Sequence, residues 1–234
     1  MVLNKSGETH YPCLHSPGSV DLLNFTPDGD LLVVNAARCS FNKEHTIFDE
    51  KKDKKLLNYL AQHKHLLPFR HPSVTVRIVA PLFVLRQLGK HQVGFSWSEV
   101  SRRYISSEPQ FYIPKGCWRT SSDDVKQGSS DYFINLEHGI VADNKLHVHY
   151  QQSLNLYKYY LDSDICSEQA RMVLPQAMFT TTVTTGTLLG WHHLYQLRTD
   201  SHTQKETREY AHVIGDIMST IFPHSWEALC EHSS

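Results

Sequence analysis

The pattern of apolar and polar positions predicts three β-strands. At 72–79, two valines and an isoleucine alternate with serine, threonine and arginine, as in a half-buried strand. Segment 19–25 is predicted as a strand that ends at a Pro-Asp-Gly turn. Segment 176–185 is rich in β-branched residues, which favour strands.

Helical spacing of apolar residues marks much of the remaining chain. At 146–161, leucines and tyrosines recur along one face of an amphipathic helix. At 51–65, leucines lie opposite a lysine-rich face. Further helices are predicted at 34–38, 81–88, 168–174, 188–197, 203–221 and 226–230. These elements predict an α+β fold, a single domain with a mixed or antiparallel sheet flanked by long helices.

Two segments depart from this periodicity. Residues 1–18 contain glycine, proline and polar residues, and we interpret them as a lead-in to a domain at 19–234. Residues 115–144 are polar and irregular, and the segment is longer than structureless connections usually are. We therefore predict an inserted loop or lid there.

Composition narrows the class of protein. The net charge is -1, whereas a general nucleic-acid binder usually has a basic excess, so no nucleic-acid partner is predicted. No apolar run is long enough to span a membrane, and the first residues lack the apolar core of a signal peptide. Five scattered cysteines without CxxC spacing indicate a reduced, intracellular and cytoplasmic protein.

The sixteen histidines include three close pairs, at 63 and 65, 147 and 149, and 192 and 193. A zinc site normally needs three or four ligands with matched spacing. No pair has a third partner nearby in the sequence, so no metal site is predicted.

The strongest candidate site lies at 80–114. A predicted helix at 81–88 leads into a polar loop at 89–100, which ends in Ser-Arg-Arg-Tyr at 101–104, predicted to enter a strand. Guanidinium groups and free backbone N–H groups both match phosphate oxygens. The segment therefore suits a phosphorylated small ligand.

A second candidate is Arg198. It follows an apolar run and precedes Asp200 and Ser201, the predicted N-cap of a long helix, whose N-terminus attracts anions. The alternative for any single arginine is a surface ion pair that contributes little. No activated nucleophile is evident, since Ser101 has no base beside it in the sequence.

Eight short motifs together resemble the flavin-dependent thymidylate synthases. Each is weak alone, but their order and spacing are specific, and the similarity covers the chain from about Ser19 to the C-terminus. The motifs are Ala36-Ala-Arg38-x-Ser40-Phe41, His63-x-His65, Pro68-Phe69, Ala80-Pro-x-Phe83-Val84-x-Arg86-Gln87, Glu99-x-Ser101-x-Arg103-Tyr104, Phe111-Tyr-Ile-Pro114, Ala170-Arg-x-Val-Leu-Pro175 and Leu197-Arg-x-Asp-Ser-His202-x-Gln204-x-Glu206.

The resemblance implies the fold of that family and transfer of a one-carbon unit from methylenetetrahydrofolate to C5 of dUMP, giving dTMP. It implies FAD as carrier and reductant, NADPH as the donor that re-reduces the flavin, and a homotetramer with shared active sites. Such a reaction needs no protein nucleophile, which agrees with the absence of an evident one.

The resemblance also implies roles for individual residues. Arg198 is the implied catalytic residue, which stabilises negative charge as the pyrimidine N3 loses its proton. Among the implied dUMP contacts, Ser101, Arg103 and Arg171 bind the phosphate. The dUMP set is Gln87, Leu88, Gly89, Lys90, Glu99, Val100, Ser101, Arg102, Arg103, Arg171 and Arg198, and the FAD set is Lys90, His91, Gln92, Glu99, Thr187, Leu189 and His193.

Several flavin positions depart from the family. Its Arg-His-Arg triplet is Lys-His-Gln here, at 90–92, and the loop from there to Ser101 is one residue longer. Arg70 stands where an acidic residue is usual. The family's Asn-x-Arg and later Asn fall on Thr187, Leu189 and His193. Two alternatives therefore stay open, a related pyrimidine-nucleotide C5-modifying enzyme, for example one that transfers a hydroxymethyl group, and a non-catalytic dUMP-binding protein.

Overall fold

A six-stranded antiparallel sheet organises the chain in the computed structural model, which describes residues 2–3, 9–12, 17–105, 107–115, 117–121 and 129–233. The strand order is β1-β2-β3-β4-β8-β5. The strands are β1 (Val2–Leu3), β2 (Thr9–Pro12), β3 (Ser19–Phe25), β4 (Ser73–Pro81), β8 (Phe179–Thr187) and β5 (Phe95–Glu99). The α+β prediction is confirmed, with antiparallel pairing along the described sheet.

Strand β4 follows the predicted alternation. Val74, Val76, Ile78 and Ala80 are fully buried, while the residues between them are half-buried. Because a shift of one residue would turn every apolar side chain out of the core, this alternation fixes the register of β4 against β8.

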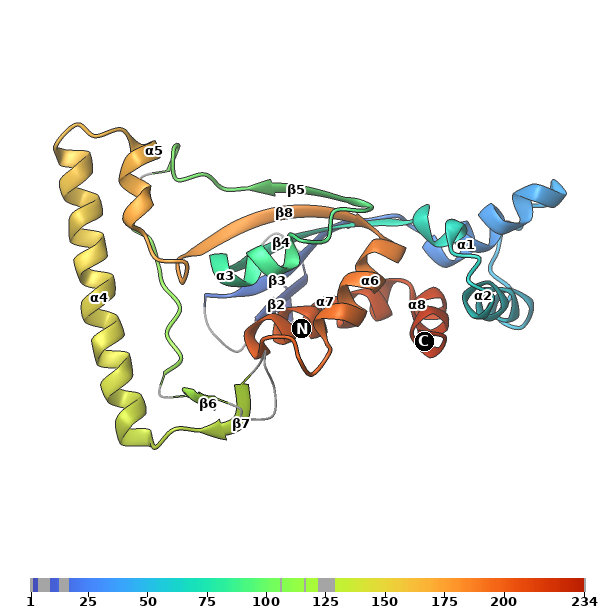
Figure 1. Cartoon of the computed structure of the whole chain (residues 1–234). Helices are drawn as coiled ribbons and strands as arrows, with labels where there is room; N and C mark the ends of the chain where they lie inside the picture. The colour runs from blue at the N-terminus through green and yellow to red at the C-terminus, as the bar shows by residue number, and fades with distance from the viewer. Residues whose placement is uncertain are drawn as a thin grey trace.

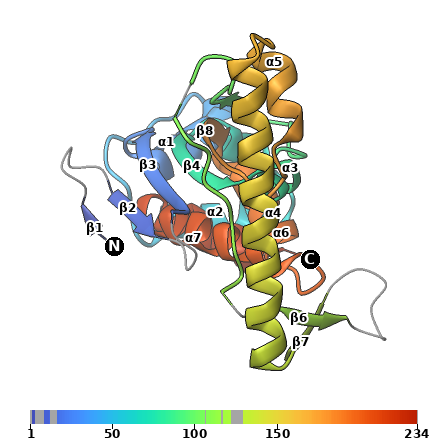
Figure 2. The same ribbon diagram turned by 90° about the vertical axis from the view of Figure 1, so that its left-hand side faces the viewer.

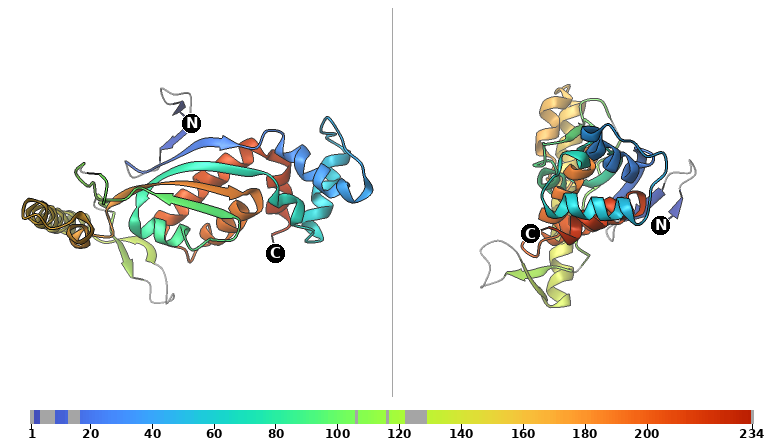
Figure 3. Two further views of the ribbon diagram at one scale, coloured as in Figure 1. Left: turned by 90° about the horizontal axis from the view of Figure 1, so that it is seen from above. Right: turned by 90° about the vertical axis from the view of Figure 1, so that its right-hand side faces the viewer.

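Helices cover one face of the sheet (Figures 1 and 3). They are α3 (Leu82–Leu88), α6 (Leu188–Arg198) and α7 (Lys205–Ile221). Helix α7 buries Tyr210, Ile214, Ile217 and Met218, whose helical spacing places them on one face. This layer and β4 form the hydrophobic core.

Three helices pack at one end of the sheet: α1 (Gly29–Arg38), α2 (Lys52–Gln62) and α8 (Pro223–Glu231). The short 3₁₀ turns η1 (Cys39–Phe41) and η2 (Leu67–Arg70) adjoin them. Asp53 is completely buried in α2, where it pairs with Arg38 of α1 and accepts from the Asp49 amide at 2.9 Å. The pair ties α1 to α2 and fixes the segment between them.

Helix α4 (Leu136–Asp162) stands across the opposite end of the sheet (Figures 1 and 2). The hairpin of β6 (Arg119–Ser121) and β7 (Ser129–Phe133) precedes it, and α5 (Ser167–Ala170) and η3 (Arg171–Val173) follow it. One side of α4 packs on the body through Tyr150, Leu154 and Tyr157. Its remaining surface exposes apolar side chains, at Leu136, Ile140, Val141, Val148, Leu156, Tyr159 and Leu161.

The structure differs from the predicted elements in three places. Strand β5 lies within the predicted polar loop and precedes Ser101, whereas residues 101–104 form a turn and not a strand. Residues 2–3 and 9–12 of the predicted lead-in pair in the sheet. The segment 115–144 contains the hairpin and the first turns of α4, which begins early because the Asn135 side chain caps the Glu137 amide at 2.8 Å.

Gly186 of β8 explains why β5 pairs where it does. The Phe95 ring lies over this glycine and meets Trp191 edge-on at 4.7 Å. A Cβ added at Gly186 would lie 2.4 Å from the Phe95 ring and 2.8 Å from the Trp191 indole nitrogen. Any side chain there displaces both rings.

We expect Gly186→Ala to lower the free energy of unfolding by about 1–3 kcal/mol, because overpacking forces aromatic side chains out of their rotamers. Urea denaturation measures the change. Val183→Thr, at an exposed position of the same strand, is the control and is expected to change stability by less than about 0.5 kcal/mol. Equal stability of Gly186→Ala and the parent chain would contradict the packing described.

Candidate active site

Two hydrogen-bonded pairs near the C-terminal ends of α3 and α6 contain Gln87 and Arg198, and we call these four residues the Arg198 cluster (Gln87, His91, Arg198 and Gln204). Arg198 is the last residue of α6, and its Nε donates to Nε2 of His91 at 3.1 Å. Gln87 of α3 donates from Nε2 to Oε1 of Gln204 at 2.7 Å. The indole of Trp97 donates to the His91 carbonyl at 3.0 Å and holds the loop in place.

The Arg198 cluster holds a neutral histidine beside a cation. Burial, and then the positive charge of Arg198, lower the pKa of His91 to about 4. His91 is therefore neutral near pH 7, and because Nε2 accepts from Arg198, its proton lies on Nδ1. Among the described residues, Arg198 meets an imidazole and no carboxylate, so its charge is available to an anionic ligand.

Ser101 and Arg103 form a second cluster with α5 and η3, which we call the Ser101 cluster (Glu99, Ser101, Arg103, Glu168 and Arg171). The Ser101 hydroxyl accepts from the backbone N–H and Nε of Arg103, both at 3.3 Å. Arg103 also pairs with Glu168 at 3.2 Å, on the exposed surface. The cluster thus gathers hydroxyl and guanidinium donors at the end of β5.

Two effects act in opposite directions on the pKa of the Glu99 carboxyl. Desolvation raises the pKa of its carboxyl, while the positive charges of Arg171 and then Arg86 act against that rise. The side chain nevertheless keeps a solvent-exposed surface. The structure therefore brings Glu99, Ser101, Arg103 and Arg171 together, as the motifs implied, and adds Arg86.

The two clusters lie at opposite ends of β5. Strand β5 runs from Phe95 to Glu99 between the loop that carries His91 and the turn that carries Ser101. No hydrogen bond or ion pair between described residues joins the Arg198 cluster to the Ser101 cluster. The implied dUMP contacts thus come from both ends of β5, and Arg86, next to Gln87 in α3, acts electrostatically on Glu99.

The other implied nucleotide contacts are neighbours of these clusters along the chain, and the fold uses several of them elsewhere. Leu88 is completely buried in the core, and Gly89 ends α3. Lys90 is exposed. The backbone N–H of Val100 already donates to the Thr181 carbonyl at 2.9 Å. Arg102 bonds the carbonyl of Ser107, away from Arg103.

The implied flavin positions are only partly accessible. Leu189 is 2% exposed and packs in the core, so its side chain is not free to contact a ligand. The Thr187 hydroxyl caps α6 by accepting from the Gly190 amide at 3.1 Å. Gln92 donates to the Gly89 carbonyl at 2.5 Å, and His193 remains exposed beside the Arg198 cluster.

The predicted N-cap at Asp200 or Ser201 is wrong. Helix α7 begins at Lys205, with Gln204 as its N-cap residue. Asp200 instead accepts from the His202 amide at 2.8 Å and closes a turn. Arg198 therefore lies at the C-terminal end of α6 rather than directly before a helix N-terminus.

A groove of about 770 Å³ is lined in part by residues of three of the motifs, at 36–41, 65 and 68, although none of these residues is in the implied dUMP or FAD set. Tyr59, Lys64, His65 and Arg70 line it, and no acidic residue is among the described residues of its wall. Arg70 acts electrostatically on His193 and so connects the groove with the Arg198 cluster. The available signals were these three motifs and Tyr59, an exposed aromatic residue on the helix predicted to show a lysine-rich face.

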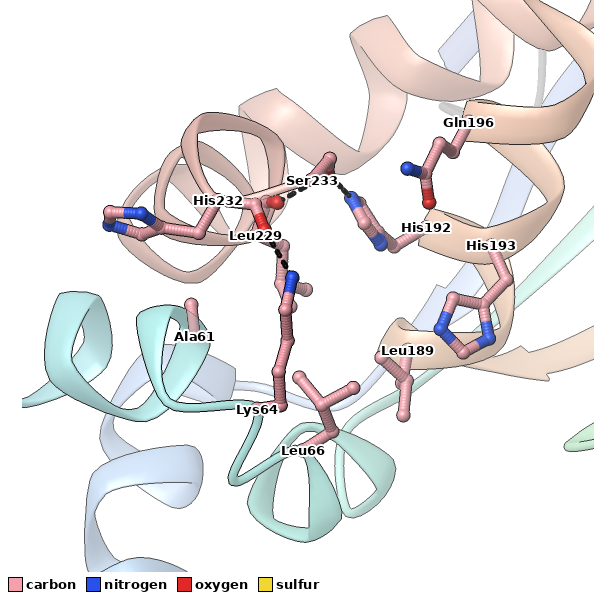
Figure 4. Close-up of a pocket in the computed structure, with 10 residues that line it drawn as sticks. All are labelled: Ala61, Lys64, Leu66, Leu189, His192, His193, Gln196, Leu229, His232 and Ser233. Carbon is pink, nitrogen blue, oxygen red and sulfur yellow. Dashed lines mark hydrogen bonds between the residues drawn. The ribbon is translucent and has the colours of Figure 1, made fainter.

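A smaller cavity of about 80 Å³ lies beside this groove, between α6 and α8 (Figure 4). Lys64 donates to the His232 carbonyl at 2.6 Å, and His192 lies 2.9 Å from the Ser233 hydroxyl. Burial lowers the pKa of His192 to about 4. These contacts hold the C-terminal helix against α6.

Two further classes of site were sought in the described residues. No three histidine, cysteine or acidic side chains there are grouped so as to hold a metal ion. None of the helices described is both long and apolar enough to cross a membrane.

Comparison with known proteins identifies the family. The sequence model described as thymidylate synthase complementing protein matches residues 21–224. A flavin-dependent thymidylate synthase of Kosmotoga olearia is 35% identical over 202 residues, covering 85% of this chain and 84% of that protein. One of Thermotoga neapolitana is 33% identical over 220 residues, covering 92% of each. The chain belongs to the flavin-dependent thymidylate synthase family. The resemblance carried by its motifs is confirmed.

Solved structures agree with this assignment. A UMP/dUMP methylase from Streptomyces cacaoi bound with 5-Br dUMP has a TM-score of 0.82 at 28% identity, covering 93% of this chain and 96% of that one. The same methylase bound with 5-Br UMP gives a TM-score of 0.80 at 25% identity. The predicted fold of the flavin-dependent thymidylate synthases is thus confirmed.

We expect Arg198→Gln to raise the pKa of His91 from about 4 toward its usual range, because one of the charges that oppose protonation is removed. An NMR titration of the imidazole measures the change. Lys55→Gln removes an exposed charge on α2 and serves as the control, with His91 unchanged. A pKa that stays at about 4 in Arg198→Gln would contradict the contact.

Proposed function

We propose that this protein is a flavin-dependent thymidylate synthase that converts dUMP to dTMP. The observation that carries the proposal is the half-buried Arg198, paired with a neutral His91 and with no carboxylate among the described residues. A fixed cation in a partly dry site stabilises developing negative charge far more than it would in water. It suits a pyrimidine that loses the N3 proton and becomes nucleophilic at C5.

In this proposal, different residues bind the pyrimidine and the phosphate of the nucleotide. Arg198 faces the pyrimidine, and Gln87 holds its edge by hydrogen bonding. Ser101, Arg103 and Arg171 bind the phosphate, for which guanidinium forks and hydroxyls are suited. Neutral His91 keeps Arg198 oriented without neutralising its charge, because it offers a lone pair and no negative charge.

The groove beside His193 fits a flavin. Its volume of about 770 Å³ lies in the usual range for cofactor sites. Tyr59 and His65 offer flat surfaces to a ring system, and Lys64 and Arg70 offer charge to a diphosphate. Bound FAD supplies the one-carbon carrier and the hydride. Leu189 and Thr187 are left out of this assignment because the fold already uses their side chains.

The complete site needs more than one subunit. No hydrogen bond or ion pair between described residues joins the Ser101 cluster to the Arg198 cluster, and in this proposal the phosphate end and the pyrimidine end come from different copies. The exposed apolar side chains of α4, including Ile140 and Val148, offer a surface that a second copy can cover. Both features support a homotetramer with shared active sites.

NADPH and methylenetetrahydrofolate complete the proposed reaction as co-substrates. An intracellular location is part of the proposal and is supported by four unpaired cysteines in the described residues. The burial of Leu189 and the capping role of Thr187 also favour a second candidate, a C5-modifying enzyme with another outcome, such as hydroxymethyl transfer.

We expect the purified protein to be yellow with bound flavin and to form dTMP from dUMP, methylenetetrahydrofolate and NADPH. Arg198→Ala is expected to lower kcat roughly 100- to 1,000-fold, because it removes a preorganised cation from the transition state. Lys55→Ala, exposed on α2, is the matched control and should keep full activity.

Mass spectrometry of the product separates the candidates. A methyl group adds carbon without oxygen, whereas a hydroxymethyl product retains oxygen and would establish the second candidate. A colourless protein that binds dUMP but yields no product would overturn both and leave the non-catalytic binding protein.

A further inference from the structure

The hairpin of β6 and β7 is joined to α7 by a buried ion pair. Arg119 of β6 donates from Nη1 and Nη2 to the two carboxylate oxygens of Glu206, both at 2.9 Å. Only 16% and 10% of the two side chains are exposed. A bidentate pair of this kind fixes orientation as well as distance.

The Glu206 carboxylate accepts a further hydrogen bond from a neighbouring tyrosine. The Tyr112 hydroxyl donates to Oε1 at 3.2 Å, and Tyr150 of α4 donates to the Tyr112 carbonyl at 2.9 Å. Burial is the largest single influence and raises the pKa of Glu206, but the hydrogen bonds and charge of Arg119, the backbone hydrogen bond and Gln204 together outweigh it, and the pKa is lowered. Glu206 is therefore ionised and can only accept hydrogen bonds.

The ionised state of Glu206 determines how two side-chain amides, those of Gln204 and Gln87, are oriented. Gln204 is the N-cap residue of α7, two positions before Glu206, and its side chain contributes to lowering the pKa of that carboxylate. An ionised carboxylate can interact in this way only with the NH₂ group of the Gln204 amide. Its Oε1 is then directed to Gln87, whose Nε2 donates to it at 2.7 Å. The Gln87 amide consequently has its NH₂ group engaged and its carbonyl oxygen free to accept from a ligand.

We propose that Arg119 and Glu206 are positioning residues, which act through Gln204 to hold the Gln87 amide with its carbonyl oxygen facing the nucleotide. The inference rests on the proposed function, since it takes Gln87 as a contact of the pyrimidine nucleotide. The ligand group that fits this oxygen is a hydrogen-bond donor, an N–H or a hydroxyl. The hairpin then supports the substrate site from a distance.

The ion pair also keeps Gln204 available. Without Arg119, the buried Glu206 carboxylate loses its two strongest donors and must draw on others nearby. The Gln204 amide is one of them, so it would turn further toward Glu206 and away from Gln87. Loss of Arg119 therefore loosens Gln87 although the two residues do not touch.

The test measures dUMP binding in a double-mutant cycle. Arg119→Gln and Glu206→Gln are each expected to weaken dUMP binding about five- to tenfold, the equivalent of one oriented hydrogen bond. kcat should change less than about threefold. In a Gln87→Ala background the same substitutions should add less than about twofold, because the group that they position is absent.

Controls separate positioning from general damage to the hairpin. Thr120→Val alters the next residue of β6 and removes its 2.7 Å contact with Ser130, yet leaves the relay in place, so it should bind dUMP normally. Circular dichroism and thermal unfolding establish that each variant is folded. If Arg119→Gln fails to fold, Arg119→Lys and Tyr112→Phe keep part of the network and should give intermediate losses.

The binding and activity measurements distinguish a failure of the relay from a failure of the proposed function. Losses in the Gln87→Ala background as large as those in the parent chain, or folded variants with unchanged affinity, overturn the relay. A parent chain that binds dUMP without forming dTMP overturns the proposed function alone, because the cycle reads binding. A parent chain that does not bind dUMP overturns both.

Discussion

The ladder between β4 and β8 is the constraint on which the rest of the molecule depends. Its register runs from Ser73 opposite Thr187 to Pro81 opposite Phe179. One face of β4 is buried under α6 and α7, so a shift by one residue would expose the core. β8 in turn carries β5 along its other edge and leads directly into α6, which fixes where both candidate clusters lie.

The positions of the charged side chains in the candidate site depend on the ladder between β4 and β8. The end of α6 brings Arg198 to His91, while the end of β5 brings Ser101 to Arg103. Among the described residues, the Arg198 cluster and the groove beside it offer positive charge without an acidic partner at Arg198. In the proposed function an anionic ligand supplies the negative charge, and partial burial favours its binding.

The hairpin and α4 both support the first turn of α7. Arg119 reaches Glu206 in the first turn of α7, and α4 supports the same place through Tyr150. The cost of burying these charges is offset only because each oxygen of Glu206 has a donor. A satisfied polar network of this kind rigidifies the side chains linked to it.

By itself, the sequence determined the secondary structure wherever periodicity is strong, as in β4 and α7, and it determined the family through the order of its motifs. Alternation and helical spacing are local properties of the chain, so they can be read without knowing the fold. It did not reveal β5, because a five-residue strand with serines on one side is defined by what Phe95 and Trp97 pack against.

Only the tertiary structure decided which site residues are available. Leu189 is buried, Thr187 caps a helix, and Arg102 turns away from Arg103, yet all three resemble accessible residues when read along the chain. The link from Arg119 to Glu206 joins residues far apart in the sequence, and the groove lined by Tyr59 and Arg70 depends on how α1, α2 and η2 pack on one another. Such contacts depend on how the elements pack, which no local pattern of hydrophobicity or charge encodes.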